Sequence, residues 1–130
     1  MKKIITVIGA IIENENKEIL CALRSPKMSL PNHWEFPSGK LEKGEGYKEA
    51  VEREIKEQLN CSIEFINVVK YNTQEYHDFM MTLVTVKCKL VSGIPNSKEH
   101  SKLLWLNKEY LPSLKWINAN IPTVDLLAVQ

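Results

Sequence analysis

Charge of one sign is not in excess in this sequence. Seventeen lysine and arginine residues stand against sixteen aspartate and glutamate residues, which gives a formal net charge of +1. Proteins that hold long nucleic acids or anionic membrane surfaces by their charge carry a clear basic excess. We therefore expect no long nucleic acid and no membrane as partners. A polyanionic ligand would have to be held by a local group of side chains or by a metal ion.

Cysteines are few, and none has a close neighbour in the sequence. The three are Cys21, Cys61 and Cys88. Disulfide frameworks and zinc sites use even numbers or closely spaced pairs of cysteines, so this pattern argues against both. We expect the three residues to be small core side chains in a reducing cytoplasm.

Long hydrophobic runs are also missing. The uncharged stretch near the start of the chain covers nine residues, 4–12, whereas a transmembrane helix needs about 20. Two lysines precede this stretch, as in a signal peptide, but no small-residue cleavage site follows it. Its isoleucine and valine content predicts a buried strand instead. The sequence thus predicts a soluble, cytoplasmic protein, and no pattern in it predicts an oligomeric state.

The pattern that is present predicts one α+β domain over residues 1–130. A chain of 130 residues with 44% hydrophobic residues can bury one substantial core. The expected elements are a β-hairpin over 3–24, a loop over 25–46, a helix over 47–59, β-strands within 61–73, 79–91 and 102–106, a helical turn at 107–111, and a helix after Asn120. The long loop is rich in proline and glycine, and a loop of this length in a compact domain is often functional.

The predicted helix over 47–59 carries a group of polar side chains on one face. Glu54, Glu57 and Gln58 are three and four positions apart, so they lie side by side beside the apolar stripe. Two carboxylates at this spacing repel each other unless a cation lies between them. Clustered oxygen ligands suit Mg²⁺ or Mn²⁺, which also bind substrate phosphates. The alternative is a charged helix face that is simply solvated.

The residues around this face decide between these alternatives. Gly39, five further residues, Glu45, seven further residues and then the run Arg53–Glu57 resemble the Nudix box of the Nudix hydrolases. The sequence departs from the family pattern at Gln58, where a glutamate is usual, and at Asn60, where glycine is usual. The resemblance implies a Nudix fold, in which a mixed β-sheet is sandwiched between the box helix and a C-terminal helix.

Three further segments are similar to MutT-like members of that family. They are "WEFPSGK" at 34–40, with Ser38 in place of the usual first glycine, "KEHSKLLWL" at 98–106 and "NANIP" at 118–122. This wider resemblance implies a nucleoside triphosphate pyrophosphohydrolase, which converts a nucleoside triphosphate and water into a nucleoside monophosphate and pyrophosphate.

The resemblance also implies roles for individual residues. The cofactor would be Mg²⁺ or Mn²⁺, which would neutralise phosphate charge and acidify the attacking water. Its ligands would be Glu54, Glu57, Gln58, Glu99 and the backbone carbonyl of Ser38. Either Glu54 or Glu99 would take the proton from the water. Arg53 would position the glutamates, while Glu45 would order the loop and Gly39 would supply a conformation that a side chain would obstruct.

Nucleotide recognition is expected from three other residues. By resemblance, Asn120 would hydrogen-bond to the edge of the base, Arg24 would reach the base or its sugar, and Phe36 would offer its backbone. Asn120 could instead serve only as the cap of the last helix. Oxidised purine triphosphates such as 8-oxo-dGTP are one candidate substrate, and cytidine triphosphates are another. His100 adjoins Glu99, and we expect its side chain to be exposed to solvent.

Two other functions are compatible with the same motif. One is a Nudix hydrolase that acts on another nucleoside diphosphate derivative, such as a dinucleotide polyphosphate, a nucleotide sugar or a capped RNA end. The other is a nucleotide-binding module with weak catalysis, because Gln58 brings no negative charge to the metal. An amide oxygen can coordinate Mg²⁺, but we expect a higher metal requirement than a glutamate would give.

Overall fold

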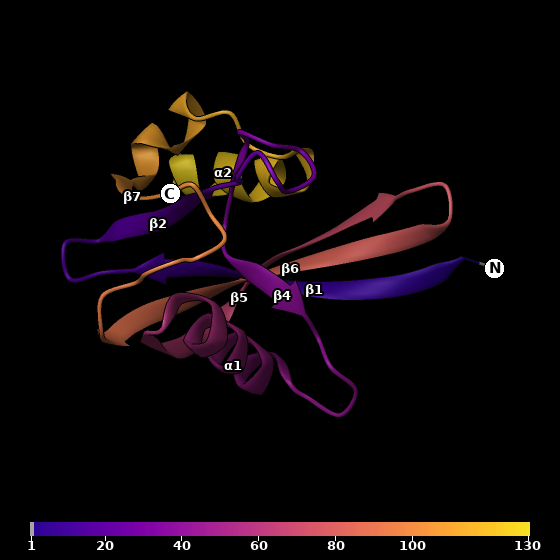
Figure 1. The fold of residues 1–130 in the computed structure, drawn as a ribbon, viewed down its shortest axis with the longest axis horizontal. Helices are drawn as coiled ribbons and strands as arrows, with labels where there is room; N and C mark the ends of the chain where they lie inside the picture. The colour runs from indigo at the N-terminus through magenta and orange to yellow at the C-terminus, as the bar shows by residue number, and fades with distance from the viewer. Residues whose placement is uncertain (1) are drawn as a thin grey trace.

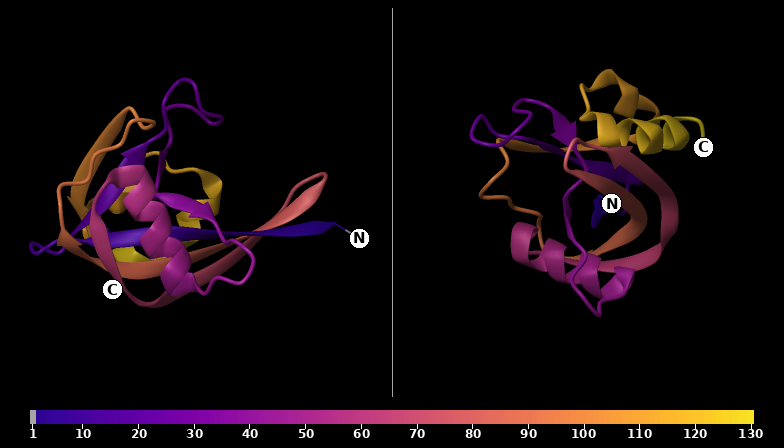
Figure 2. Two further views of the ribbon diagram at one scale, coloured as in Figure 1. Left: turned by 60° about the horizontal axis from the view of Figure 1, so that its bottom comes forward. Right: turned by 90° about the vertical axis from the view of Figure 1, so that its right-hand side faces the viewer.

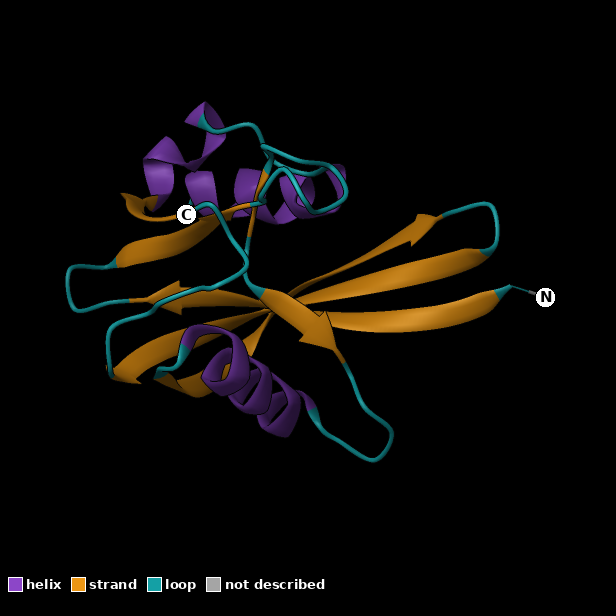
Figure 3. Cartoon of the chain, viewed as in Figure 1, coloured by secondary structure: helices purple, strands orange, loops and turns teal. Residues whose placement is uncertain are grey.

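A seven-stranded mixed β-sheet lies at the centre of the computed structural model, which describes residues 2–130 (Figure 1). The strands are β1 (Lys3–Glu13), β2 (Glu18–Leu23), β3 (Trp34–Glu35), β4 (Ser38–Lys40), β5 (Ser62–Glu75), β6 (Phe79–Ser92) and β7 (Lys102–Asn107). Helix α1 (Tyr47–Leu59) covers one face, and helix α2 (Ile121–Ala128) lies on the other (Figures 1 and 3). This arrangement confirms the predicted fold class.

Strand β1 organises the sheet. The order of the main strands is β3-β2-β1-β6-β5, and β1 runs parallel to β6 along its whole length, from Lys3 opposite Phe79 to Glu13 opposite Lys89. All other pairs are antiparallel, with β4 added beside β1 and β7 beside β2. The predicted hairpin over 3–24 is present as β1–β2, and the strands predicted within 61–73 and 79–91 form a second antiparallel hairpin, β5–β6. The turn between β5 and β6 extends beyond both helices, beside the start of β1 (Figure 2).

The two faces of β1 belong to two separate hydrophobic cores. Ile8, Ala10 and Ile12 are buried together with the apolar side of α1, whereas Ile11 is buried with residues of α2 and with Phe36. Successive side chains of a strand point to opposite faces, so one uncharged run can supply both cores. This is why β1 reads as continuously apolar, and it explains how the two helices come to lie on opposite sides.

Helix α1 begins and ends where the sequence predicts. Its buried residues Ala50, Val51, Ile55 and Leu59 form the expected stripe. Asn60 ends the helix in the left-handed conformation, with φ 53° and ψ 40°, and its N–H bonds to the carbonyl of Lys56. Asparagine tolerates this conformation better than most residues, so the departure from glycine at position 60 leaves the helix end intact.

Two expectations from the sequence are wrong. The segment 25–46 is not a continuous loop, because it contains the short strands β3 and β4. Strands of two and three residues show too little alternation to be recognised, and β4 exists because β1 offers it partners at Val7, Ile8 and Gly9. The second is that Asn107 would cap the helical turn at 107–111: this turn is a 3-10 helix (η1, Lys108–Ser113), and no side-chain cap bond from Asn107 is found within residues 2–130.

Two predicted absences can be compared with the structure. No helix in residues 2–130 is long and apolar enough to cross a membrane. Cys21, Cys61 and Cys88 are buried free thiols, as expected. Burial raises the pKa of Cys21, and also that of Cys88, to about 12 from the ordinary value of 9.0.

The buried thiols predict a loss of stability at alkaline pH. Unfolded thiols ionise near pH 9, whereas the folded ones keep their protons until much higher pH, so the free energy of unfolding falls as the pH rises between these values. We expect a loss of about 1.4 kcal/mol per thiol between about pH 8 and about pH 10. Urea unfolding at both pH values checks this, with a Cys21→Ala, Cys88→Ala double variant as control. An equal loss in the double variant would contradict it.

Candidate active site

The end of α1 packs tightly against strand β4. A Cβ atom at Gly39 would overlap with the carboxyl group of Glu54, which therefore lies directly over the backbone of this strand. Only glycine leaves room for such an approach. The predicted role of Gly39 thus has a specific geometric basis, since the residue determines where the Glu54 carboxylate can lie.

Arg53 holds two of the motif glutamates. Its Nε and NH2 groups donate to the two carboxylate oxygens of Glu45, at 2.7 and 2.9 Å, and its NH1 group donates to Glu54 Oε1 at 2.8 Å. These bonds raise the pKa of Arg53 and lower the pKa of Glu45. Glu45 also accepts the backbone N–H of Glu42. Arg53 therefore ties Glu45, in the loop before α1, to the Glu54 carboxylate that lies over β4, as a paired and bidentate guanidinium can.

Gln58 is turned with its amide nitrogen toward the expected metal ligands. Its Nε2 donates to the carbonyl oxygen of Ser38 at 2.7 Å and to Glu54 Oε2 at 2.8 Å. The Ser38 carbonyl and the Glu54 carboxylate can only accept hydrogen bonds. The Gln58 amide must therefore present its NH₂ end to them, and not its oxygen. The polar NH₂ group bridges these acceptors in the way that a cation would. A metal ion that bound both oxygens would have to displace it.

One cavity brings the motif carboxylates together with Glu99. It has a volume of about 690 Å³ and is lined by Glu54, Lys56, Glu57, Gln58, Asn60, Asn96, Lys98 and Glu99. The expected ligands on α1 thus share a space with the distant glutamate. Lys56 and Lys98 were not predicted for the site. Lys56 lies within the Arg53–Glu57 run and Lys98 begins the segment at 98–106, but the resemblance assigned a role to neither.

The side chains that line this cavity are suited to a divalent metal ion without forming a closed site. As they stand, no three histidine, cysteine, aspartate or glutamate side chains in the described part of the chain, 2–130, converge on one point. Glu54 is occupied by Arg53 and Gln58, and the side chain of Glu57 is 63% exposed. The cation between these two carboxylates is Arg53, whose NH1 lies 2.8 Å from Glu54 Oε1 and 3.5 Å from Glu57 Oε2. Carboxylate, amide and carbonyl oxygens are nevertheless the donors that Mg²⁺ and Mn²⁺ prefer, so the residues fit the expected ion in kind.

Asn120 connects the last helix to the segment before β4. Its side chain is buried, and its Oδ1 accepts the backbone N–H of Phe36 at 2.8 Å. The oxygen is therefore used by Phe36 and not by the start of α2, so the interpretation of Asn120 as a mere helix cap is wrong. The same bond occupies the N–H of Phe36, one of the two backbone groups that this residue was expected to offer to a base. The Asn120 amide nitrogen stays available as a donor.

Arg24 is directed toward a neighbouring loop. Its Nε donates to the carbonyl of Ser29 at 2.6 Å, its NH2 to the hydroxyl of Ser29 at 2.9 Å, and its NH1 to Glu35 Oε1 at 2.7 Å. These bonds use three of the five N–H donors of a guanidinium. Arg24 therefore closes the 25–33 loop in this structure, and two of its N–H groups remain for a ligand.

The expectation that His100 is exposed is wrong. Its side chain is 4% exposed, and its Nε2 lies 2.8 Å from Glu35 Oε2. The sequence signal was weak, because Glu35 and His100 are far apart along the chain and only the pairing of β2 with β3 and β7 brings them together.

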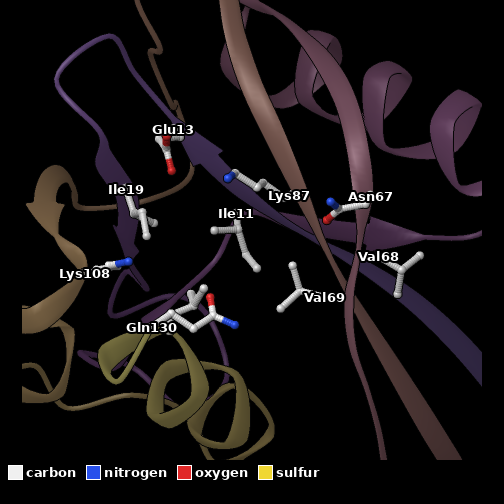
Figure 4. A pocket seen from close by; sticks show the side chains of 10 residues that line it. Ile11, Glu13, Ile19, Asn67, Val68, Val69, Lys87, Lys108 and Gln130 are labelled. Carbon is white, nitrogen blue, oxygen red and sulfur yellow. The ribbon is translucent and has the colours of Figure 1, made fainter.

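A second cavity, of about 450 Å³, lies beside α2 and contains none of the predicted site residues (Figure 4). Its floor is formed by Ile11, Ile19 and Val69, and Lys87 and Lys108 stand at its edge. The motif residues line the other cavity, next to α1, and it is there that we place the candidate site.

Comparisons with known proteins agree with this geometry. The family model described as NUDIX domain matches residues 3–127. The chain is 32% identical over 127 residues to the 8-oxo-dGTP diphosphatase of Escherichia coli (strain K12), covering 98% of both chains. It is 29% identical over 123 residues to the CTP pyrophosphohydrolase of the same strain, covering 95% of this chain and 90% of the relative. A solution structure of the MutT protein of methicillin-resistant Staphylococcus aureus 252 superposes with a TM-score of 0.81 at 44% identity, covering 99% of this chain and 98% of the other.

The buried Asn120–Phe36 bond predicts a specific loss of stability. In Asn120→Ala the N–H of Phe36 stays buried without an acceptor, which we expect to cost about 1–3 kcal/mol of unfolding free energy. Asn118→Ala, two residues away and exposed, serves as the matched control and should change stability by less than about 0.5 kcal/mol. Equal effects in urea unfolding of the two variants would show that the bond contributes nothing.

Proposed function

Because this chain belongs to the Nudix family of hydrolases, we propose that it is a metal-dependent nucleoside triphosphate pyrophosphohydrolase. It would convert a nucleoside triphosphate and water into a nucleoside monophosphate and pyrophosphate. The observation that carries the proposal is the shared cavity, which gathers Glu54, Glu57, Gln58 and Glu99 beside two lysines. A site for a triphosphate needs both a metal-binding group and local positive charge, and the nearly neutral protein supplies them together in this cavity.

Different residues of this chain would have different roles in the reaction. Glu54, Glu57, Glu99, Gln58 and the Ser38 carbonyl would hold Mg²⁺ or Mn²⁺. When bound, such an ion neutralises phosphate charge and acidifies a water molecule. Lys56 and Lys98 would attract the phosphates, and Arg53 would keep Glu54 in place through the bonds already described.

Glu99 is the better placed of the two candidate bases. Both oxygens of Glu54 already accept hydrogen bonds, one from Arg53 and one from Gln58. Among residues 2–130 the carboxylate of Glu99 has no such partner, and the residue is exposed at the cavity. A general base needs a free oxygen within reach of the water. We therefore propose that Glu99 takes the proton in addition to its contribution to the metal site, while Glu54 serves the metal alone.

The base of the nucleotide would be read on the side of Asn120. Its amide nitrogen can donate to an acceptor on the base edge, because its oxygen is already used by Phe36. Two relatives support two candidate substrates, namely 8-oxo-dGTP and CTP. A site that offers a buried polar group discriminates strongly against bases that leave it unpaired, so we expect a clear preference for one base.

The first test is pyrophosphate release from a panel of canonical and oxidised nucleoside triphosphates, at several Mg²⁺ and Mn²⁺ concentrations. We expect turnover with one preferred base, and a loss of at least roughly 100-fold in Glu57→Gln, which removes a charged ligand. Glu49→Gln makes the same change on the same helix, away from the cavity, and should keep full activity. Absence of turnover with every nucleotide and metal would favour the nucleotide-binding module instead.

Gln58→Glu tests the metal-binding role of position 58. The added charge should lower the metal concentration for half-maximal turnover by about 10-fold. Without metal, a carboxylate would replace the amide that bridges Ser38 and Glu54, so the variant should be less stable than the wild type in EDTA and gain more from added Mn²⁺ in thermal unfolding. An unchanged metal dependence, in both turnover and unfolding, would mean that position 58 does not reach the ion.

A further inference from the structure

A buried charged group connects strand β3 to the segment that carries Glu99. Glu35 is 5% exposed, and each of its carboxylate oxygens has one partner: Arg24 NH1 at 2.7 Å and His100 Nε2 at 2.8 Å. A carboxylate in the interior is costly unless it is paired and hydrogen-bonded. The buried Glu35 carboxylate is therefore stabilised by both Arg24 and His100, and loss of either bond would be costly.

The hydrogen bonds around His100 determine its tautomer. The hydroxyl oxygen of Ser97 accepts the backbone N–H groups of Glu99 and His100, at 3.2 and 3.0 Å. Its remaining capacity is to donate, and its partner is His100 Nδ1 at 2.9 Å. Nδ1 is then the acceptor, so Nε2 carries the hydrogen and donates to Glu35. Every polar atom of the imidazole is thus used to hold one turn of backbone.

Within residues 2–130, the backbone hydrogen bonds that attach this turn to other elements are at its two ends. The N–H of Asn96 bonds to the carbonyl of Leu59 at the end of α1, and the N–H of Ser101 bonds to the carbonyl of Leu23 on β2. Between these two points the chain belongs to no strand or helix. His100, which directly precedes Ser101, links this segment to the interior through Glu35 and, through Ser97, links its two ends to each other. The residue immediately before it, Glu99, is exposed at the cavity.

We propose that His100 and Glu35 are positioning residues that hold the Glu99 carboxylate at the active site. This inference rests on the proposed function of Glu99. His100 positions Glu99 indirectly, through the backbone of the turn. The imidazole of His100 is itself held by its hydrogen bond to the buried carboxylate of Glu35. Arg24 completes the pairing of Glu35 from the side of the 25–33 loop. Loss of the His100 bond frees the turn, so Glu99 spends less time in its working position.

The expected kinetic effect therefore falls on the chemical step and on the metal requirement, and kcat is compared at saturating metal. In His100→Leu, which cannot donate to Glu35, kcat should fall by roughly 10- to 100-fold, the usual effect of losing a residue that orients a ligand. KM for the nucleotide should change by less than about 3-fold, because the base side at Asn120 is untouched. His100→Gln can place its amide nitrogen close to the position of Nε2, and it should recover much of kcat.

Two controls separate positioning from general damage. His77 is on the β5–β6 turn with a side chain 98% exposed, so His77→Leu repeats the substitution without the contact and should behave as the wild type. Hydrogen exchange of residues 96–101 should become faster in His100→Leu and stay unchanged in His77→Leu. If His100→Leu does not fold, Ser97→Ala removes the other bond of the imidazole and should act in the same direction.

The deciding experiment is a double-variant cycle with Glu99→Gln, measured on kcat. If His100 acts through Glu99, adding His100→Leu to Glu99→Gln should cause less than about a 3-fold further loss. Independent losses that multiply would overturn the positioning role, as would a His100→Leu enzyme with wild-type kcat beside an impaired Glu99→Gln. A fully active Glu99→Gln would instead overturn the proposed function of Glu99 itself, and the inference with it.

Discussion

The approach of the Glu54 carboxylate to the backbone of β4 is the contact on which the candidate site depends. It is possible because Gly39 has no side chain, and it is maintained by Arg53 on one oxygen and by Gln58 on the other. The Arg53 guanidinium also binds Glu45 with two hydrogen bonds, so the loop before α1 is tied to the same point. A carboxylate surrounded by donors in this way keeps its place before any ligand arrives, which is what a catalytic arrangement requires.

Gln58 gives this protein an individual character within its family. The amide nitrogen bridges Ser38 and Glu54 where a further carboxylate would repel them. The Gln58 amide thereby holds these oxygens together in the absence of metal without adding a positive charge. If an ion binds the same oxygens, as proposed, the amide nitrogen must turn away or be displaced. On the proposed metal-binding role of Gln58, stability without metal and affinity for metal are opposed at this position, and glutamine in place of glutamate favours the former.

The candidate site has parts on both faces of the sheet. The segment that contains β3 and β4 connects these parts. Glu35, Phe36 and Ser38 follow one another on this short segment and bind His100, Asn120 and Gln58 respectively. Three elements distant in sequence, the Glu99 turn, the start of α2 and the end of α1, are therefore held by neighbouring residues of one segment. A small displacement of that segment would therefore move the proposed metal ligands and Asn120, the proposed base-reading residue, at the same time.

The sequence alone determined the family, the order of the main elements, the bounds of α1 and the residues of α1 that line the candidate site. Each of these rests on local spacing, because the box fits one loop and one helix and apolar periodicity marks the buried stripe. It could not reveal β3 and β4, the burial of His100 or the direction of the Gln58 amide. A strand of two residues exists only because a neighbour pairs with it, a histidine is buried only if a distant carboxylate receives it, and an amide turns toward whichever acceptors folding brings near. These were decided by the tertiary structure, since each depends on contacts between residues that the chain order keeps apart.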